Sequence, residues 1–389
     1  IMKKAFIITL LHFIALNLYA QKEFTIRGTV TNVEDGSIFH LTRSVGRVLI
    51  TIAQDTIVNG KFTVNAQTDK EVEKLEAFLW GKKCSGMIRH IYVSSGLQIN
   101  IQGDSLYIFD WNIESNLKEQ KEDNSFNAAA NLSYYKQERI NQERNEWFKV
   151  IESSKATKKE RKIARQMTDS LLIILREAHN EMYKAFIEVM KDTPISTVWM
   201  DKLYDLSVAY RYTAGFPYHN ETLAYFNRLT KEQKATPIGK KIAINLSPRS
   251  KVNPGDKMID ANLYDPEGKL HHLAELKGKY ILLDFWSSGC GPCIMSVPEM
   301  KEVQEKYKDK LSIVSLSSDV ESIWKEASAK HQMTWYNWND RKETSGLYLK
   351  YGVRGIPHYV LISPKGKIIA SWSGYGKDQL LKKMEKFIK

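Results

Sequence analysis

The sequence predicts an α/β protein in three parts: an antiparallel β-sandwich, a helical region and a C-terminal domain with a mixed sheet flanked by helices. Apolar and polar residues alternate up to about residue 110, as in half-buried strands. From 111 to 247 apolar residues recur every three or four positions, and from 248 strand-like and helix-like segments alternate. We therefore predict domains at 21–110, 111–247 and 248–389.

The first element, at 1–20, has the pattern of a secretory signal peptide. Lys3 and Lys4 precede an apolar run over 5–18, and Ala20 suits the position before cleavage. This pattern predicts export to the periplasm or cell envelope. The alternative is an uncleaved anchor, although the run is shorter than a spanning helix needs. No later apolar run is long enough to cross a bilayer, so we expect no transmembrane span after cleavage.

The next element, the β-rich region at 21–110, is predicted from strands such as the one that carries Phe24, Ile26 and Val30 on one face. Asn59-Gly60 separates two strand-like runs, which is the usual signature of a tight hairpin turn.

The helical region contains one long helix and at least one further helix. Asp192-Thr193-Pro194 ends the first, and the second follows. We interpret the aromatic and methionine positions as core packing, so no cofactor is expected. The apolar face predicted for the long helix consists of Ile163, Met167, Leu171, Ile174, Ala178, Met182, Phe186 and Val189.

Charge does not indicate a nucleic-acid partner, despite a formal net charge of +12. Basic and acidic residues are mixed along the predicted helices, as in the segment 158–162, which is typical of a solvated helix surface. An exported protein also meets little nucleic acid. A weak preference for anionic membrane surfaces remains the alternative.

The chain has 3 cysteines, of which only Cys290 and Cys293 are close in sequence. One close pair favours a single reactive dithiol over a disulfide scaffold. We interpret Cys84 as a spectator, because free cysteines are commonly buried and inert. Structural zinc is disfavoured, since one such pair supplies two ligands and no nearby pair completes the set.

The cysteine pair follows a predicted buried strand and opens a predicted helix. Residues three apart in a first helical turn face the same side, so their sulfurs can bond. The N–H groups and positive potential of a helix N-terminus stabilise a thiolate. We therefore expect Cys290 to be the exposed nucleophile and Cys293 to be the buried resolving thiol.

Asp284 sits at the end of the same apolar strand, where a charge is costly without a partner or a proton. One hypothesis is a carboxyl beneath the cysteines that accepts and returns the Cys293 proton through water. The alternative is an exposed carboxylate at the strand end. The apolar flanks Leu283 and Phe285 favour the first interpretation.

The segment from Asp284 through Cys290-Gly291-Pro292-Cys293 resembles thioredoxin, including the six-residue step from the acid to the first cysteine. Pro298 matches the proline that kinks thioredoxin's active-site helix, and Ile356-Pro357 matches its cis-proline loop. The resemblance implies a thioredoxin-like fold for 248–389 and these substrate-binding residues: Trp286, Gly291, Pro292, Ile356, Pro357 and Gly374.

The wider pattern over 252–389 resembles the exported TlpA/ResA-like branch of this superfamily. That resemblance implies a thiol–disulfide oxidoreductase of the cell envelope, with protein thiol or disulfide substrates and a membrane electron donor. The β-rich region also resembles a domain of unassigned function that often precedes such domains. Two positions are closer to thioredoxin itself: Gly291-Pro292 between the cysteines, and Asp284 where many relatives have Asn. A reducing poise is therefore expected.

His358 stands where thioredoxin has Thr, and we interpret it as a surface strand residue rather than as a group that donates to a substrate or tunes the thiolate. The predicted function is reduction of protein disulfides by Cys290 and Cys293 through a mixed disulfide. The alternatives are a thiol-dependent peroxidase, and an envelope binding or scaffold protein with auxiliary redox function.

Overall fold

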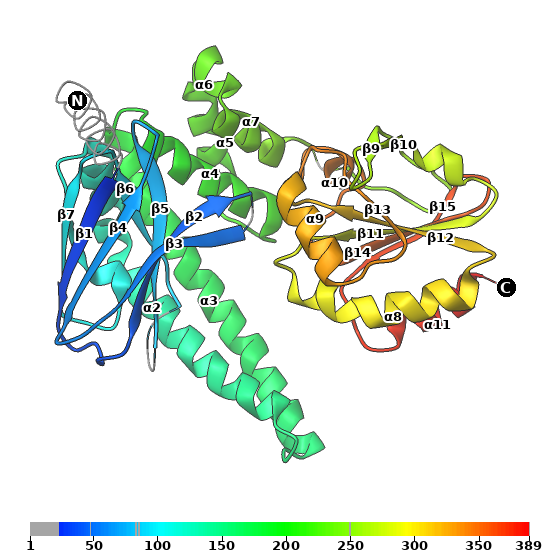
Figure 1. Cartoon of the computed structure of the whole chain (residues 1–389), viewed down its shortest axis with the longest axis horizontal. Helices are drawn as coiled ribbons and strands as arrows, with labels where there is room; N and C mark the ends of the chain where they lie inside the picture. The colour runs from blue at the N-terminus through cyan, green and yellow to red at the C-terminus, as the bar shows by residue number, and fades with distance from the viewer. Residues whose placement is uncertain (1–22, 47, 82–83, 85, 249, 389) are drawn as a thin grey trace, which may run out of the picture. The chain divides into compact units, whose positions relative to one another are not determined.

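The computed structural model describes residues 23–46, 48–81, 84, 86–248 and 250–388; the expected signal peptide lies outside them (Figure 1). The chain divides into two compact units. Of the described residues, one unit comprises 23–44 and 49–242, and the other comprises 45, 46, 48 and 243–388.

Two four-stranded sheets form the β-rich part of the first unit. One has the strand order β4-β1-β7-β8 and the other β3-β2-β5-β6. Their bounds are β1 Glu23–Val30, β2 Ile38–Val45, β3 Val48–Thr56, β4 Lys61–Gln67, β5 Glu73–Trp80, β6 Arg89–Val93, β7 Gln98–Gly103 and β8 Asn112–Glu114.

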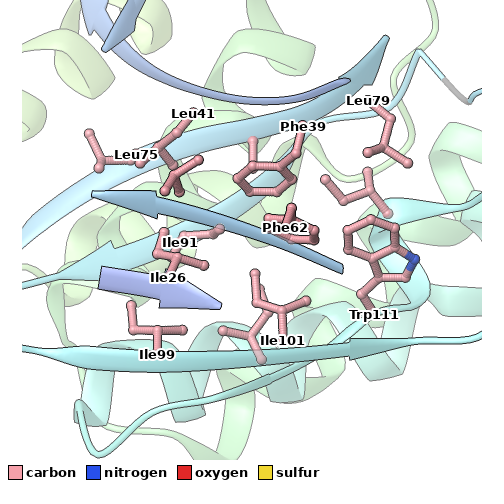
Figure 2. Packing of buried hydrophobic residues seen from close by; sticks show 14 of the residues in the cluster. Ile26, Phe39, Leu41, Phe62, Leu75, Leu79, Ile91, Ile99, Ile101 and Trp111 are labelled. Atoms are coloured by element: carbon pink, nitrogen blue, oxygen red, sulfur yellow. The ribbon is translucent and has the colours of Figure 1, made fainter. Parts of the chain in front are cut away.

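Side chains from both sheets fill the space between them (Figure 2). Ile26 and Ile99, which are register partners on β1 and β7, have no exposed surface, and neither do Phe39 and Leu75 from the other sheet. Phe39 stacks on Phe62, with 4.3 Å between ring centroids. The alternation of apolar residues thus predicts the buried faces correctly, because successive strand residues point to opposite faces.

Three details of the sandwich differ from the prediction. β1 and β7 pair in parallel, so the first sheet is mixed. Asn59 and Gly60 do form a tight turn with positive φ values of 50° and 68°. The flanking pair is only Val58 with Lys61, however, and β3 and β4 belong to different sheets. β8 pairs with β7, so the sandwich extends to Glu114.

Helices make up the rest of the first unit. They are α2 Lys118–Glu152, α3 Lys158–Asp192, α4 Thr197–Tyr212, α5 His219–Arg228, α6 Lys231–Ala235 and α7 Pro237–Leu246, whose last residues pass into the second unit. The two 35-residue helices α2 and α3 form a long hairpin (Figure 1). Thr157 and Glu160 make a capping box at the start of α3, and Ser196 caps α4 through the Trp199 N–H.

A buried ionic cluster joins the sandwich to these helices. Asp123 of α2 is 1% exposed and accepts hydrogen bonds from Arg89 of β6 and from Lys202 of α4. The Lys202 contact measures 2.8 Å. These cations hold the pKa of Asp123 well below its usual range, although burial opposes that shift.

The second unit has a five-stranded mixed sheet in the order β13-β12-β11-β14-β15. β11, β12 and β13 run parallel, while β14 and β15 are antiparallel. The bounds are β9 Leu263–Tyr264, β10 Leu270–His271, β11 Tyr280–Trp286, α8 Gly291–Tyr307, β12 Leu311–Ser317, α9 Glu321–Lys330, β13 Tyr336–Trp338, α10 Leu347–Lys350, β14 His358–Ile362, β15 Ile368–Ser373 and α11 Gln379–Phe387.

Both faces of this sheet are covered. α8 and α11 lie together along one face, where Leu282, Met300 and Met384 belong to one buried cluster (Figure 1). Leu283 and Val360 point into a separate cluster on the opposite face. β11 is therefore buried on both sides, which is why its sequence reads as a continuous apolar run.

Candidate active site

Cys290 and Cys293 lie where β11 ends and α8 begins. Cys290 is the N-cap residue of α8, and Gly291 and Pro292 form its first turn. The two sulfurs are bonded, with a Cα–Cα distance of 5.2 Å. Cys290 Sγ also accepts the Cys293 N–H at 3.2 Å. The sulfur thus occupies the position at which a helix N-terminus stabilises negative charge.

The two cysteines differ in exposure in the expected order. Cys293 is 2% exposed and packs against Trp286, Trp324 and Ala327. Cys290 is only partly buried, at the edge of the same cluster. An incoming disulfide can therefore reach Cys290, while Cys293 is covered.

Asp284 is 3% exposed, so the alternative of an exposed strand-end carboxylate is wrong. Its Oδ2 accepts a 2.7 Å hydrogen bond from Ser315, and its Oδ1 has no hydrogen-bond partner among the residues that the structure describes. Burial raises the pKa of Asp284 to about 7, and the Ser315 hydrogen bond opposes the rise only in part. This carboxyl can hold or release a proton near neutral pH.

Trp286 is placed differently from its predicted role. Its side chain has no exposed surface and lies against Cys293 and Trp324. A fully covered indole cannot contact a substrate in this conformation. Trp286 instead packs against the buried cysteine, Cys293. Gly291 and Pro292, by contrast, are exposed beside Cys290.

The loop before β14 approaches the cysteines from another part of the chain. The Ile356–Pro357 bond is cis, as the resemblance implies. Ile356 packs on the cluster that contains Cys290 and Cys293. The Gly374 N–H donates to the Pro357 carbonyl at 2.8 Å, and Gly374 has a φ of +88°, which favours glycine. The structure thus brings Ile356 to the cysteine pair and joins Gly374 to the cis-proline loop.

His358 is 7% exposed, so its interpretation as a surface residue is wrong. It lies between two hydroxyls: Nδ1 is 2.7 Å from Ser373 Oγ, and Nε2 is 3.0 Å from Ser371 Oγ. Burial lowers the pKa of His358 to about 4. His358 lies on β14, which is flanked by β11 and β15 in the sheet. The local sequence does not show that the strand has a neighbour on each side.

Cys84 is half-buried in the first unit, with its sulfur 3.8 Å from Ser37 Oγ. Burial raises the pKa of this thiol, so little thiolate forms at neutral pH. This environment agrees with the interpretation as a spectator.

Residues that the sequence did not single out complete the site beneath α8. Ser315 of β12 and Tyr359 of β14 are the register partners of Asp284 on either side of β11. Trp335 donates to Ser315 Oγ at 2.8 Å, and Glu299 of α8 is 5% exposed. Ser315 could have been noticed as a polar residue inside an apolar strand. Its assignment to the site, however, required the pairing of β11 with β12, which places it beside Asp284.

Among the helices of the described residues, none is both long and apolar enough to span a bilayer. In the same part of the chain, no group of three or more His, Cys, Asp or Glu side chains is arranged to hold a metal ion.

The fold and the bonded cysteine pair define a thioredoxin-like domain. Residues 278–368 match the family described as thioredoxin-like. ResA, a thiol–disulfide oxidoreductase from Bacillus cereus, is 31% identical over 147 residues, which cover 37% of this chain and 81% of ResA. The thioredoxin-like protein YneN from Bacillus subtilis is 30% identical over 121 residues, or 30% of this chain and 69% of YneN.

Among solved structures, the thioredoxin domain of a thiol–disulfide oxidoreductase from Bacteroides vulgatus is 30% identical. The match covers 36% of this chain and 100% of that domain, with a TM-score of 0.33. The chain belongs to the ResA-like family of thiol–disulfide oxidoreductases, and is itself an oxidoreductase.

Proposed function

We propose that this protein reduces protein disulfides in the cell envelope through its Cys290–Cys293 pair. One observation carries the proposal: a partly exposed Cys290 at a helix N-terminus is bonded to a buried Cys293. Asp284, whose pKa is raised to about 7 by burial, lies on the neighbouring strand. These are the parts that dithiol exchange requires.

The exchange begins with the reduced pair. The Cys290 thiolate attacks one sulfur of a substrate disulfide, and the other substrate sulfur leaves as a thiolate that takes up a proton. Cys293 then loses its proton to Asp284 and attacks Cys290 Sγ, which breaks the mixed disulfide and releases the second substrate thiol. Two electrons pass from the cysteine pair to the substrate, and the enzyme disulfide is formed.

Substrate would lie across Gly291, Pro292 and the cis-proline loop. The cis bond ends the loop before β14 begins at His358, so the Ile356 N–H and carbonyl lie outside the β14 ladder. An extended peptide can pair with such groups as a short β-strand addition. Gly374, which donates to the Pro357 carbonyl, has no atom within 4 Å of the place that a Cβ would occupy.

The direction of electron flow is tested by the reduction potential of the pair. Purified protein is equilibrated in graded dithiol buffers and the alkylated thiols are counted. A potential near thioredoxin's, about −270 mV, is expected for a reductant that is itself reduced by a membrane electron carrier. A potential near about −120 mV would make the protein an oxidant and overturn the proposed direction.

The exchange itself is tested by trapping. In Cys293→Ser the mixed disulfide cannot be resolved, so Cys290 should retain substrate proteins as dithiothreitol-sensitive adducts in envelope extracts. Cys290→Ser is the matched control and should retain none. Equal retention of substrate proteins by the two variants would contradict the assignment of Cys290 as the attacking cysteine and Cys293 as the resolving one.

The envelope location rests on the charged and apolar pattern of 1–20. We propose cleavage after Ala20, a β-rich domain and helical region over 21–247, and a thioredoxin-like domain over 248–389. Expression of the whole chain with a C-terminal tag, followed by fractionation and mass measurement of the mature N-terminus, tests the leader. A tagged product that keeps residues 1–20 in the cytoplasm would contradict it.

A further inference from the structure

Three buried polar groups beneath α8 have at most one hydrogen-bond partner within the described chain. Asp284 Oδ1 and Glu299 Oε2 have none, and the Tyr359 hydroxyl has only the Ser296 side chain. The residues Asp284, Glu299 and Tyr359 are 3%, 5% and 1% exposed, respectively. Buried polar atoms are nearly always satisfied by protein or by ordered water, so three together indicate a polar track in an otherwise apolar layer.

The three residues face the same layer. Asp284 and Tyr359 are direct register partners on β11 and β14, so their side chains point to the same face of the sheet. Tyr359 belongs to the buried cluster that Met300 of α8 and Met384 of α11 also join. Glu299 precedes Met300 on α8, and its Oε1 accepts the Leu381 N–H of α11 at 2.9 Å.

The charges of both carboxyl groups act on the tyrosine. The pKa of Tyr359 is raised by burial and then by the charges of Asp284 and Glu299. A hydrogen bond with the Ser296 side chain opposes this rise, while the Ser296 hydroxyl donates to the Cys293 carbonyl at 2.7 Å. The order Asp284, Tyr359, Glu299 therefore leads away from the cysteine pair along α8.

The charge of Glu299 also acts on a tyrosine that is partly exposed. Burial and the charge of Glu299 raise the pKa of Tyr375, which is partly exposed, and Asp378 and Glu302 add to that rise. Asp378 and Glu302 are themselves exposed. These are the ionisable groups that act on Tyr375 from the β15–α11 loop and from α8. Ser315 and Trp335 close the other side of Asp284 with neutral groups.

We propose that Tyr359 and Glu299 form, with Asp284 and bridging water, a proton path from the Cys293 thiol to the surface near α11. The path rests on the proposed dithiol exchange and supplies its proton step. Tyr359 and Glu299 act through Asp284 and are positioning residues for that step.

The proton balance is simple. Cys293 gives its proton to the Asp284 carboxylate as its thiolate attacks Cys290. Protonated Asp284 then donates to the Tyr359 oxygen while the Tyr359 hydroxyl donates to the Glu299 carboxylate, and Glu299 releases the proton to solvent. Tyr359 stays neutral throughout, as its raised pKa requires. Each transfer moves one proton along one hydrogen bond or one water.

Glu299 also has a structural role, because it caps α11 through the Leu381 N–H. Glu299→Gln separates the two roles, since its amide oxygen can still accept that hydrogen bond while the side chain cannot titrate. Tyr359→Phe removes only the hydroxyl. Glu305→Gln, at a side chain 79% exposed on the same helix, is the matched control.

The experiment follows the reaction of the reduced full chain with Ellman's reagent in stopped flow. A Cys84→Ser background is used, so that only Cys290 and Cys293 react. The first thionitrobenzoate is released by Cys290 and the second by Cys293. We expect Glu299→Gln and Tyr359→Phe to slow the second release by about tenfold at neutral pH, less than the loss of a direct acid–base group. The rate of the first release should be unchanged in both variants. Glu305→Gln should release both thionitrobenzoates at the wild-type rates.

The pH profile of the second release distinguishes a proton path from a packing effect. Both variants should lose the rise in rate that follows Asp284 near pH 7, while a structural change would scale the rate at every pH. If either variant keeps the wild-type rate and profile, the path is wrong. If Glu299→Ala lowers the thermal midpoint while Glu299→Gln keeps the wild-type midpoint, rate and pH profile, Glu299 only caps α11 and has no part in proton transfer. Absence of two-step release in the unsubstituted protein would instead overturn the proposed dithiol exchange.

Discussion

The Ser315 hydroxyl donates a 2.7 Å hydrogen bond to Asp284 Oδ2 across the parallel strands β11 and β12. Ser315 is neutral and already accepts a hydrogen bond from Trp335. It cannot offset the cost of burying a carboxylate as a cation would, so the pKa of Asp284 stays near 7. One uncharged neighbour therefore keeps this carboxyl poised for proton exchange at neutral pH.

Asp284→Asn should stabilise the protein at alkaline pH. The folded carboxyl keeps its proton up to about pH 7, whereas the unfolded one loses it near 3.8. Rising pH across this window therefore favours the unfolded chain, and the stabilising contribution is complete only below the window. At pH 8 the variant should be more stable than wild type by up to about 4 kcal/mol, at about 1.4 kcal/mol per pKa unit.

Urea unfolding of wild type and Asp284→Asn between pH 4 and pH 9 measures this difference. The advantage of the variant should grow with pH and level off above about pH 8. The same variant should slow resolution of the mixed disulfide, since the proton acceptor is lost. A stability difference that does not vary with pH would show that Asp284 is already ionised throughout the range.

His358→Gln should raise the unfolding free energy relative to wild type at acidic pH, whereas Asp284→Asn should raise it at alkaline pH. Burial lowers the pKa of His358 to about 4 from 6.5. The unfolded chain therefore binds the proton first as pH falls, and stability is lost between these values. The loss amounts to up to about 3 kcal/mol by pH 4, at about 1.4 kcal/mol per pKa unit. The variant should lack this loss while keeping hydrogen bonds to Ser371 and Ser373.

The measurement is the difference in unfolding free energy between wild type and His358→Gln from pH 4 to pH 7. The difference must be taken at each pH, because Asp284 titrates over part of the same window with the opposite sign. If the difference is constant, His358 is not the group that titrates.

Much of the second unit was predictable, because its signals are local. The apolar run of β11, the paired cysteines and the helix after them lie within one short segment, and all have the expected structure. The covered positions of Asp284 and Cys293 followed from apolar flanks and helical spacing. Ile356–Pro357 required the resemblance, because nothing local brings that loop to the cysteines.

The errors occurred where burial depends on distant partners. On α3, Ile163 and Ile174 were predicted to be buried but are 43% and 49% exposed. The buried stripe instead contains Ala164 and Leu175, because a face that packs on α2 drifts around a 35-residue helix. In the same way, the burial of Ser315 and His358 depends on strand pairing, which the local sequence does not show.

Asp123→Asn should strongly destabilise the first unit. The carboxylate is 1% exposed and compensates two buried cations, Arg89 and Lys202. Removing one partner of such a buried group leaves uncompensated charge, at a cost of about 3–5 kcal/mol. Urea unfolding at neutral pH, followed by far-UV circular dichroism, measures this cost.

The matched control for that variant is Glu146→Gln on the same helix. Glu146 pairs with Lys149, but both side chains are 70% exposed. Such a surface pair contributes about 0.5 kcal/mol or less. Equal effects of the two variants would mean that the Asp123 cluster is not buried in solution.

Cys84→Ser should leave the redox chemistry unchanged. Burial raises the pKa of the Cys84 thiol, so at neutral pH it reacts slowly with iodoacetamide compared with reduced Cys290. Mass spectrometry of the protein after short labelling should find Cys290 modified first and Cys84 last. The reduction potential of the pair should be the same in wild type and Cys84→Ser. A shifted potential, or a Cys84 disulfide with either partner during turnover, would make Cys84 a third redox centre.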